Sequence, residues 1–390
     1  MLLLLSVQCF SITPIVGLFS GIKGLVIYLF WLLGGCIILK RNHPYLLLKW
    51  HYLSPAVLIL LGVVLSFIPA YFYYGQGFFT SLIAYRVGLV YFTLPALLMI
   101  RPSLKDVKLA LFVFSALFLI LMICDSYLHI PLIAKDEKAI MREESLLARG
   151  EKDVTFLGGI QFVAMSFFFY LEDCLNKLSK KNIIITLFLF LTILLFQNRS
   201  TLFSCVLIMA FSLISLPNTH RNIKLKLIVI ATAVVVFVAS SGLWISLLRE
   251  TGEQITNTDY NRNLAYAYFL LEAPQGLINY ILGCGFLSSK ATSLMQDMME
   301  MGVYNSDVGF IGMWNQFGLL PVLTIIVCCF RALGRRRPSH LRFNALLIIC
   351  CAVTISYFWE QSTIVWASMF FYLLSINDFS ESQKHSYRRR

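Results

Sequence analysis

The chain has 390 residues, of which 58% are hydrophobic and 13% are charged, and its formal net charge is +12. About 25% of the residues of a soluble globular domain are charged, so this composition excludes that class and indicates a polytopic membrane protein. The apolar runs are about 20 residues long and lack the alternating pattern of an outer-membrane barrel, which predicts helices rather than strands.

We expect about twelve transmembrane helices, so the predicted fold class is an all-α polytopic membrane protein with a large periplasmic loop before helix 10. The predicted spans are 2–20, 22–39, 53–74, 81–100, 109–127, 154–170, 183–197, 201–216, 227–247, 308–330, 343–358 and 362–376. Lys and Arg concentrate in every second loop between them, which by the positive-inside rule places both termini in the cytoplasm. The basic residues are therefore an orientation signal, and nucleic acid is not an expected partner.

Four parts follow from this pattern. Residues 1–247 hold helices 1–9, residues 248–307 form a periplasmic loop or lid, residues 308–376 hold helices 10–12, and residues 377–390 form a cytoplasmic basic tail. The arginines of the tail act either as a topology anchor or as a contact to anionic lipid.

The cysteines indicate neither a disulfide scaffold nor a metal site. Nine of the ten lie in or beside apolar runs, where a thiol behaves as a small hydrophobic group. Cys284 has no neighbouring cysteine in the long outer loop, and no cluster of His and Cys has metal-ligand spacing. We expect the thiol of Cys284 to face outward and to react with a membrane-impermeant maleimide.

The outer loop 248–307 is a long polar segment in a chain built mainly from apolar runs. It predicts a helix that starts near Asp259 and has one shared face, formed by Tyr260, Leu264, Tyr268 and Leu271. The sequence Gly283-Cys284-Gly285 predicts a tight turn, and a second short helix is expected over 288–301.

Two arginines lie where a charge is costly in a membrane protein. Arg86 is placed five residues into an apolar run, so it either snorkels to the interface or reaches a phosphate of an outer-leaflet lipid. Arg199 belongs to the polar turn 198–201 between two short apolar runs. That segment is either a plain hairpin turn or a turn drawn into the bilayer.

Two carboxylates are candidate bases. Asp307 closes the outer loop and opens a segment in which Asp307, Ile311, Trp314 and Gly318 share a helical face. It is a helix N-cap, a catalytic base, or both. Glu360 lies at the outer turn of the last hairpin and is either a base or a turn residue.

Several short motifs occur in the order and spacing seen in the O-antigen polymerase and O-antigen ligase superfamily, which this chain resembles. They are Tyr260-Asn261-Arg262, Leu282-Gly283-Cys284-Gly285-Phe286 and the segment from Asp307 to Gly318. Arg86 resembles the arginine that the family has in an early span, and Asn198-Arg199-Ser200-Thr201 resembles its short arginine-serine turn. The likeness covers most of the chain in topology but only these motifs in sequence.

The resemblance implies a metal-independent membrane glycosyltransferase without a cofactor, of GT-C-like architecture, in the bacterial inner (cytoplasmic) membrane. Its implied substrate is a polyprenyl-pyrophosphate-linked oligosaccharide at the periplasmic face, and a chain-length regulator and a flippase are the protein partners it suggests. In the ligase branch the position of Asp307 resembles a histidine site that a small polar residue usually follows, whereas Val308 follows here. That difference favours a polymerase of O-antigen, capsular or exopolysaccharide repeat units.

Two other functions stay open. One is a ligase that transfers the glycan to a lipid or protein acceptor, and the other is a flippase or transporter of lipid-linked sugar that uses its arginines as a binding track. The sequence has no visible internal repeat of the kind that marks many transporters, although inverted repeats often leave no trace in sequence.

The chemistry of the residues agrees with a glycosyltransferase independently of the resemblance. A pyrophosphate leaving group needs fixed cations, and a guanidinium supplies paired donors and keeps its charge. We expect Arg86, Arg199 and Arg262 to bind the pyrophosphate, with Arg262 also at the reacting centre. An acceptor hydroxyl must lose a proton as it attacks, so Asp307 is the expected base and Glu360 the second choice.

Overall fold

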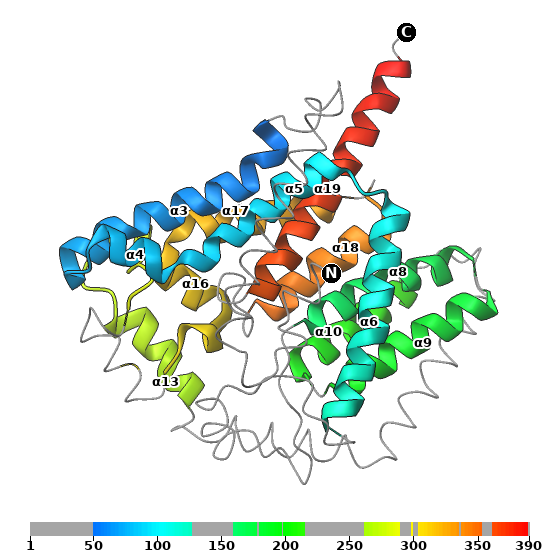
Figure 1. The fold of residues 1–390 in the computed structure, drawn as a ribbon, viewed down its shortest axis with the longest axis horizontal. Coiled ribbons are helices and arrows are strands. Elements are labelled where there is room, and N and C mark those ends of the chain that lie inside the picture. Colours follow the sequence, from blue (N-terminus) through cyan, green and yellow to red (C-terminus); the bar gives the residue numbers. More distant parts are fainter. Residues whose placement is uncertain are drawn as a thin grey trace.

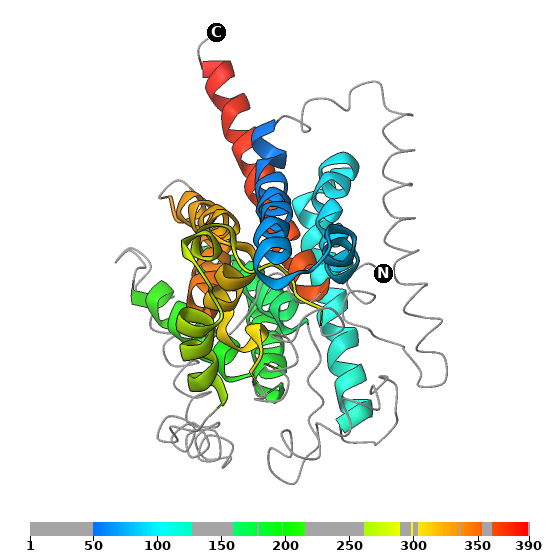
Figure 2. The same ribbon diagram turned by 90° about the vertical axis from the view of Figure 1, so that its left-hand side faces the viewer.

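The structure is a computed structural model that describes residues 50–126, 159–177, 179–196, 198–214, 261–288, 298, 303–334, 337–352 and 361–388. The predicted spans 2–20, 22–39 and 227–247 lie outside these residues. Every regular element within the described residues is a helix, which confirms the all-α class. Figures 1 and 2 show the arrangement in two views.

The first described helix is α3 (Trp50–Tyr74), which confirms the span predicted at 53–74. Over 23 of its residues it is, among the described residues, the one helix that is long and apolar enough to cross a membrane by itself. It ends at Gly75, which has a φ of 65° and donates its N–H to the carbonyl oxygen of Tyr71 at 3.1 Å. A left-handed glycine is a common end of a helix because it has no Cβ to clash.

The span predicted at 81–100 is not one straight helix. It consists of three pieces, which are α4 (Phe78–Ala84), the 3-10 helix η2 (Arg86–Phe92) and α5 (Thr93–Ile100). The two sides of the break at Tyr85 are bent by 62°, although together they are long and apolar enough to cross a membrane. The ring of Tyr85 packs so closely on Gly88 that a Cβ there would lie 2.7 Å from a ring carbon. The bend is therefore stabilised by the packing of the Tyr85 ring on Gly88.

Four helices form a bundle on the right of Figure 1, on the side of the molecule away from α4. Each of them overlaps one predicted span. They are α6 (Leu104–Ser126), α8 (Ile160–Asn176), α9 (Lys180–Leu195) and α10 (Arg199–Ile214). A capping box starts α6, because Ser103 Oγ accepts the N–H of Asp106 while the Asp106 carboxylate accepts the N–H of Ser103. Hydrogen bonds from Ser103 lower the pKa of the Asp106 carboxyl.

The span predicted at 308–330 is also divided. The pieces are the 3-10 helix η5 (Asn305–Val308), α16 (Gly309–Phe317) and α17 (Leu319–Ala332). Gly318, with a φ of 76°, separates α16 from α17. α17 packs along α3, where Gly62 leaves room for the ring of Pro321.

The last two helices are α18 (Ser339–Cys351) and α19 (Gln361–Arg388). Residues 362–375 of α19 are buried without exception, which is typical of a helix at the centre of a core. α19 packs against α3, η2, α5, α8 and α18, and it continues into the predicted tail. Its C-terminal end projects from the body near the start of α3 in both views.

The turns predicted to face the cytoplasm meet at one end of the molecule, which we call the basic end; it comprises residues 101–108, 171–182, 331–342 and 377–388. Lys108 at the start of α6 pairs with Asp173 near the end of α8. Asp378 of α19 accepts from Arg331 at 2.7 Å and from Arg337 at 2.5 Å. These ion pairs join loops that are far apart in the chain.

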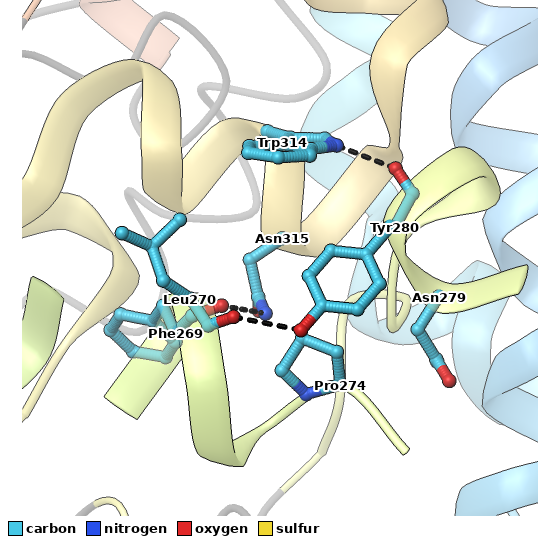
Figure 3. Close-up of a pocket in the computed structure, with 7 residues that line it drawn as sticks. All are labelled: Phe269, Leu270, Pro274, Asn279, Tyr280, Trp314 and Asn315. Carbon is cyan, nitrogen blue, oxygen red and sulfur yellow. Dashed lines mark hydrogen bonds between the residues drawn. The ribbon is translucent and has the colours of Figure 1, made fainter. Parts of the chain in front are cut away.

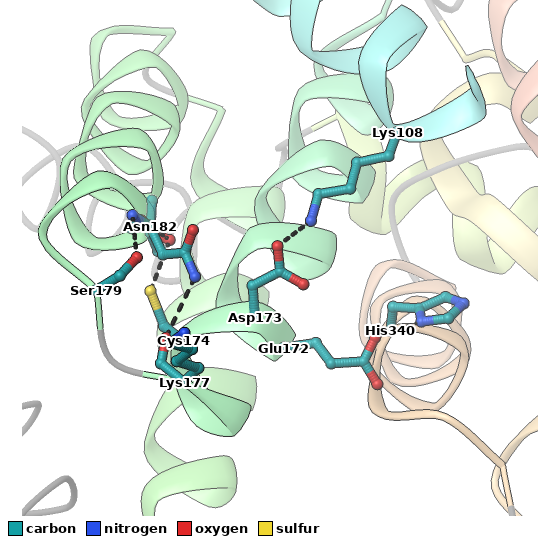
Figure 4. A network of polar contacts seen from close by, with 9 residues as sticks. Lys108, Glu172, Asp173, Cys174, Lys177, Ser179, Asn182 and His340 are labelled. Carbon is teal, nitrogen blue, oxygen red and sulfur yellow. Dashed lines mark hydrogen bonds and ion pairs between the residues drawn. The ribbon is translucent and has the colours of Figure 1, made fainter. Parts of the chain in front are cut away.

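A buried pair also ties α8 to α18 at the basic end (Figure 4). His340 is 3% exposed, and its Nδ1 lies 2.5 Å from one carboxylate oxygen of Glu172, while the other accepts the N–H of Ser339 at 2.6 Å. Burial by itself raises the pKa of Glu172, but the hydrogen bonds and charge of its partners outweigh burial, so the pKa lies below its ordinary value. The sequence did not predict this pair.

Candidate functional site

Two buried amides hold the turn that contains Asp307. Gly312 lies directly under the main chain of Asn305, so that a Cβ at Gly312 would be 2.7 Å from the carbonyl carbon of Asn305. Asn305 Nδ2 donates to Asn315 Oδ1 at 3.1 Å, and Asn315 Nδ2 donates to the carbonyl oxygen of Phe269 at 3.0 Å. Asn315 therefore connects η5 to the helices of the outer loop.

The outer loop contributes α13 (Asn261–Ala267) and the π-helix η4 (Tyr268–Glu272). Both are attached to η5 and α16 by a small hydrophobic cluster, made of Ala265, Tyr268, Phe269, Ala273, Met298, Val303 and Val308. Arg262 lies in the first turn of α13 and Asp307 lies in η5, and these two elements pack against each other. The structure describes the main chain of both residues, and it brings together the two elements that hold them.

The other predicted site residues lie elsewhere. Arg86 is exposed at the start of η2, which packs against α3, α4, α5 and α19. Arg199 begins α10, which packs against α18, α8 and α9, and the Asn198 side chain accepts the N–H of Thr201 at 3.0 Å as an N-cap. Among the described residues, neither η2 nor α10 packs closely on α13 or η5. Glu360 lies outside the described residues.

The motif Gly283-Cys284-Gly285 is joined to the end of α16 by what we call the loop–helix clamp, in which Cys284 and Gly285 bind Asn315 and Gln316. The N–H of Cys284 donates to the carbonyl oxygen of Asn315 at 2.6 Å, and the N–H of Gly285 donates to that of Gln316 at 2.9 Å. These carbonyls are at the C-terminal end of α16, where intrahelical donors run out. Gly283 and Gly285 have φ values of 88° and 86°, which glycine adopts readily, although residues 283–288 form no regular turn.

A small pocket lies between η4, α14 (Leu277–Leu282) and α16, and Figure 3 shows its lining. Its polar groups bind one another: Trp314 Nε1 donates to the carbonyl oxygen of Tyr280 at 2.5 Å, and the Tyr280 hydroxyl donates to that of Leu270 at 2.9 Å. The amide of Asn315 closes it from α16. The pocket therefore lies where the outer loop joins α16, and among its lining groups Asn279 Oδ1 is buried without a hydrogen-bond partner in the described residues.

Three predictions about the loop are wrong. Leu264 and Leu271 are 46% and 75% exposed while Tyr268 is buried, so the expected shared face does not form. Asp307 does not cap α16, since the residue before that helix is Val308 and Asp307 lies within η5. The helical face expected from Asp307 to Gly318 does not form either, because α16 extends only from Gly309 to Phe317. The helix expected over 288–301 falls mostly outside the described residues.

The expected accessibility of the Cys284 thiol is also wrong, because the side chain is buried. Cys284 is 2% exposed, and its sulfur lies 3.3 Å from the hydroxyl of Tyr74 and 3.6 and 3.7 Å from the amides of Asn315 and Asn279. We predict that a water-soluble maleimide leaves Cys284 unmodified in the folded protein and modifies it on denaturation. Cysteine introduced at the exposed Gln275 should react at once, and peptide mass spectrometry distinguishes the two. Rapid modification of native Cys284 would contradict this placement.

No protein-family model matches the chain, and a search of curated proteins finds no match. The function is therefore argued from the packing of α13 and η5 and from the chemistry of the residues that they hold.

Proposed function

We propose that this protein is a membrane glycosyltransferase that joins polyprenyl-pyrophosphate-linked oligosaccharide repeat units into a polysaccharide. The observation that carries the proposal is the packing of α13 on η5, which makes neighbours of the elements that hold Arg262 and Asp307. Glycosyl transfer from a pyrophosphate needs a cation at the leaving group and a base at the acceptor within one site. An arginine and an aspartate on adjacent elements meet that requirement.

The reaction assigns one role to each residue. Asp307 takes the proton of an acceptor sugar hydroxyl while that oxygen attacks the anomeric carbon of the donor, with Glu360 as the second choice of base. The bond from the anomeric carbon to the pyrophosphate oxygen breaks, and the electron pair leaves with the pyrophosphate. Arg262 stabilises the charge that develops there. Arg86 and Arg199 are proposed to bind the pyrophosphate of the lipid carrier as it approaches, since η2 and α10 do not pack closely on α13 or η5 among the described residues.

The proposal includes the membrane arrangement of twelve spans with both termini in the cytoplasm of a bacterial cell. The basic end supports this orientation, because the described inner loops gather on one side and bind one another there. The predicted outer turn between α3 and α4 binds the outer loop instead, since Gln76 Nε2 donates to the carbonyl oxygen of Phe286 at 2.9 Å. The predicted inner loops thus contact other inner loops, and this predicted outer turn contacts the outer loop.

The test is polymer formation by variants in cells that supply the lipid-linked repeat unit. Asp307→Asn and Arg262→Gln should abolish long polymer while single repeat units still appear on the outer surface, because export precedes the lost step. Removal of one catalytic charge typically lowers a rate by about 10²–10⁴-fold. Asp106→Asn is the matched control, since it changes an exposed carboxylate at the basic end and should leave polymer length unchanged.

Other outcomes separate the alternatives. Repeat units trapped inside the cell would identify a flippase or transporter. Loss of glycan on an acceptor lipid or protein, with free polymer retained, would identify a ligase. Full polymer length and yield in Asp307→Asn would show that Asp307 is not the base.

A further inference from the structure

The outer-loop segment 277–288 enters and leaves the bundle at the same end of α3. It enters beside Tyr74, whose hydroxyl donates to the carbonyl oxygen of Ala273 at 2.6 Å. It leaves at Ser288, whose N–H donates to Gln76 Oε1 at 2.7 Å, just beyond the end of α3. Between these two points the segment runs down along α3 as α14 and comes back without regular structure.

The deepest point of this path lies well inside the end of α3. Gly285 is pressed against that helix so closely that a Cβ there would be 2.6 Å from the Cβ of Ala70 and 3.0 Å from the carbonyl oxygen of Ser66. Ala70 is four positions before Tyr74 on α3, which corresponds to about 6 Å at 1.5 Å per residue, and the carbonyl oxygen of Ser66 points along the helix towards Ala70. In a membrane this depth lies within the outer leaflet's hydrocarbon layer, which is about 15 Å thick.

The irregular backbone at that depth is hydrogen bonded within the protein. The loop–helix clamp uses the N–H groups of Cys284 and Gly285, and Gln76 uses the carbonyl oxygen of Phe286. Cys284 is buried, and Phe286 packs against the main hydrophobic core. Non-helical backbone is tolerated inside a bilayer under this condition, when protein rather than lipid surrounds it.

The outward face of α14 has the opposite character. Leu277, Ile278 and Ile281 are 74%, 47% and 49% exposed, while Asn279 on the other face is buried. Residues 273–288 include no charged side chain. Ile68 and Phe72 of the neighbouring α3 are exposed as well, at 45% and 75%, on the side of that helix that faces away from Ser66 and Ala70. An uncharged apolar surface beside a span-length helix is suited to acyl chains.

We infer that residues 277–288 form a re-entrant segment that dips into the outer leaflet, with Leu277, Ile278 and Ile281 of α14 against lipid acyl chains. This inference rests on the proposed membrane arrangement and is independent of polymerase activity. In this arrangement the segment is fixed to α3 and α16 and does not act as a lid over the site. The re-entrant segment binds the end of α16, and α16 follows directly after η5. The position of the segment in the membrane therefore also fixes how far the candidate site lies below the membrane surface.

Photo-crosslinking in lipid nanodiscs tests the inference with the full chain. p-Benzoylphenylalanine is incorporated at Ile281, at Leu277, at the exposed Gln275 two residues before α14, and at Leu61 on the exposed face of α3. Adducts are then identified by mass spectrometry. We expect phospholipid adducts at Ile281 and Leu277 in yields comparable to Leu61 and severalfold above Gln275.

Each result decides one statement. Lipid adducts at Leu61 but at neither α14 position would overturn the re-entrant segment and leave the membrane arrangement standing. Absence of adducts at Leu61 in folded protein would overturn the membrane arrangement itself. Protein–protein adducts at Ile281 would show that a second copy or another protein covers this face, which also overturns the inference. The use of two exposed α14 positions guards against misfolding of one variant.

Discussion

Alanine at Gly318 is expected to destabilise the protein severely, because this residue is the point where the outer loop touches the break between α16 and α17. Its φ is 76°, and a Cβ would lie 2.5 Å from the carbonyl carbon of Leu282, so neither rotation nor a flexible neighbour can relieve the contact. The ψ of Gly318 is −169°, a backbone region that essentially only glycine adopts, so the conformation costs alanine about 1–3 kcal/mol, and overpacking adds about 1–3 kcal/mol. Thermal unfolding of the purified protein in detergent measures the loss.

Gly75→Ala is the matched control for this prediction. Gly75 has a similar φ of 65°, but nothing lies within 4 Å of the position of its missing Cβ. Gly75→Ala should therefore show the cost of a left-handed alanine alone, about 1–2 kcal/mol, and the larger loss in Gly318→Ala contains both the clash with the loop and the costlier backbone conformation at that position. Equal losses in both variants would mean that residues 281–285 do not pack on the helix break in solution.

Alanine at Glu172 is expected to have the second large effect. It leaves His340, which is 3% exposed, and the N–H of Ser339 without the carboxylate that binds both. A buried donor that loses its acceptor costs about 1–3 kcal/mol, and here two donors lose the same carboxylate. The neighbouring Asp173 pairs with Lys108, and its side chain is 41% exposed. Asp173→Ala is therefore expected to cost about 0–1 kcal/mol.

The effect of Glu172 should also depend on pH. Its pKa is below the ordinary glutamate value of 4.5 in the folded protein, because its hydrogen bonds to His340 and Ser339 outweigh the effect of burial. The stabilisation is therefore complete above about pH 4.5 and is lost as the pH falls through the folded-state pKa. The unfolding temperatures of wild type and Glu172→Ala should differ most near neutral pH and converge in acid. A constant difference over this range would refute the assignment.

Much of the fold was predictable, because hydrophobicity along one chain is a local property. The runs that became α3, α6, α9 and α10 were placed correctly to within a few residues. The two predicted spans at 81–100 and 308–330 are not single straight helices, because they are broken at Tyr85 and Gly318. Hydropathy is blind to such breaks, since the residues around them are as apolar as those in a straight helix.

In the candidate site, too, some features could be predicted from local sequence and others depend on how the helices pack. Arg262 and Asp307 could be selected from their charge and from the likeness of their motifs, and the structure places their elements together. The burial of Cys284 could not be anticipated, because its partners Tyr74 and Asn315 come from two distant helices. The buried role of Glu172 was missed for the same reason.

The sequence by itself determined that this protein is helical, strongly apolar and polarised by its basic loops, because composition and charge order do not depend on how helices pack. Only the tertiary structure decided that residues 277–288 are wedged between α3 and α16, and that Gly283, Gly285 and Gly318 are there to let main chains meet. Close approach of two backbones is a property of a pair of segments. It has no signal in either segment until the fold brings them together.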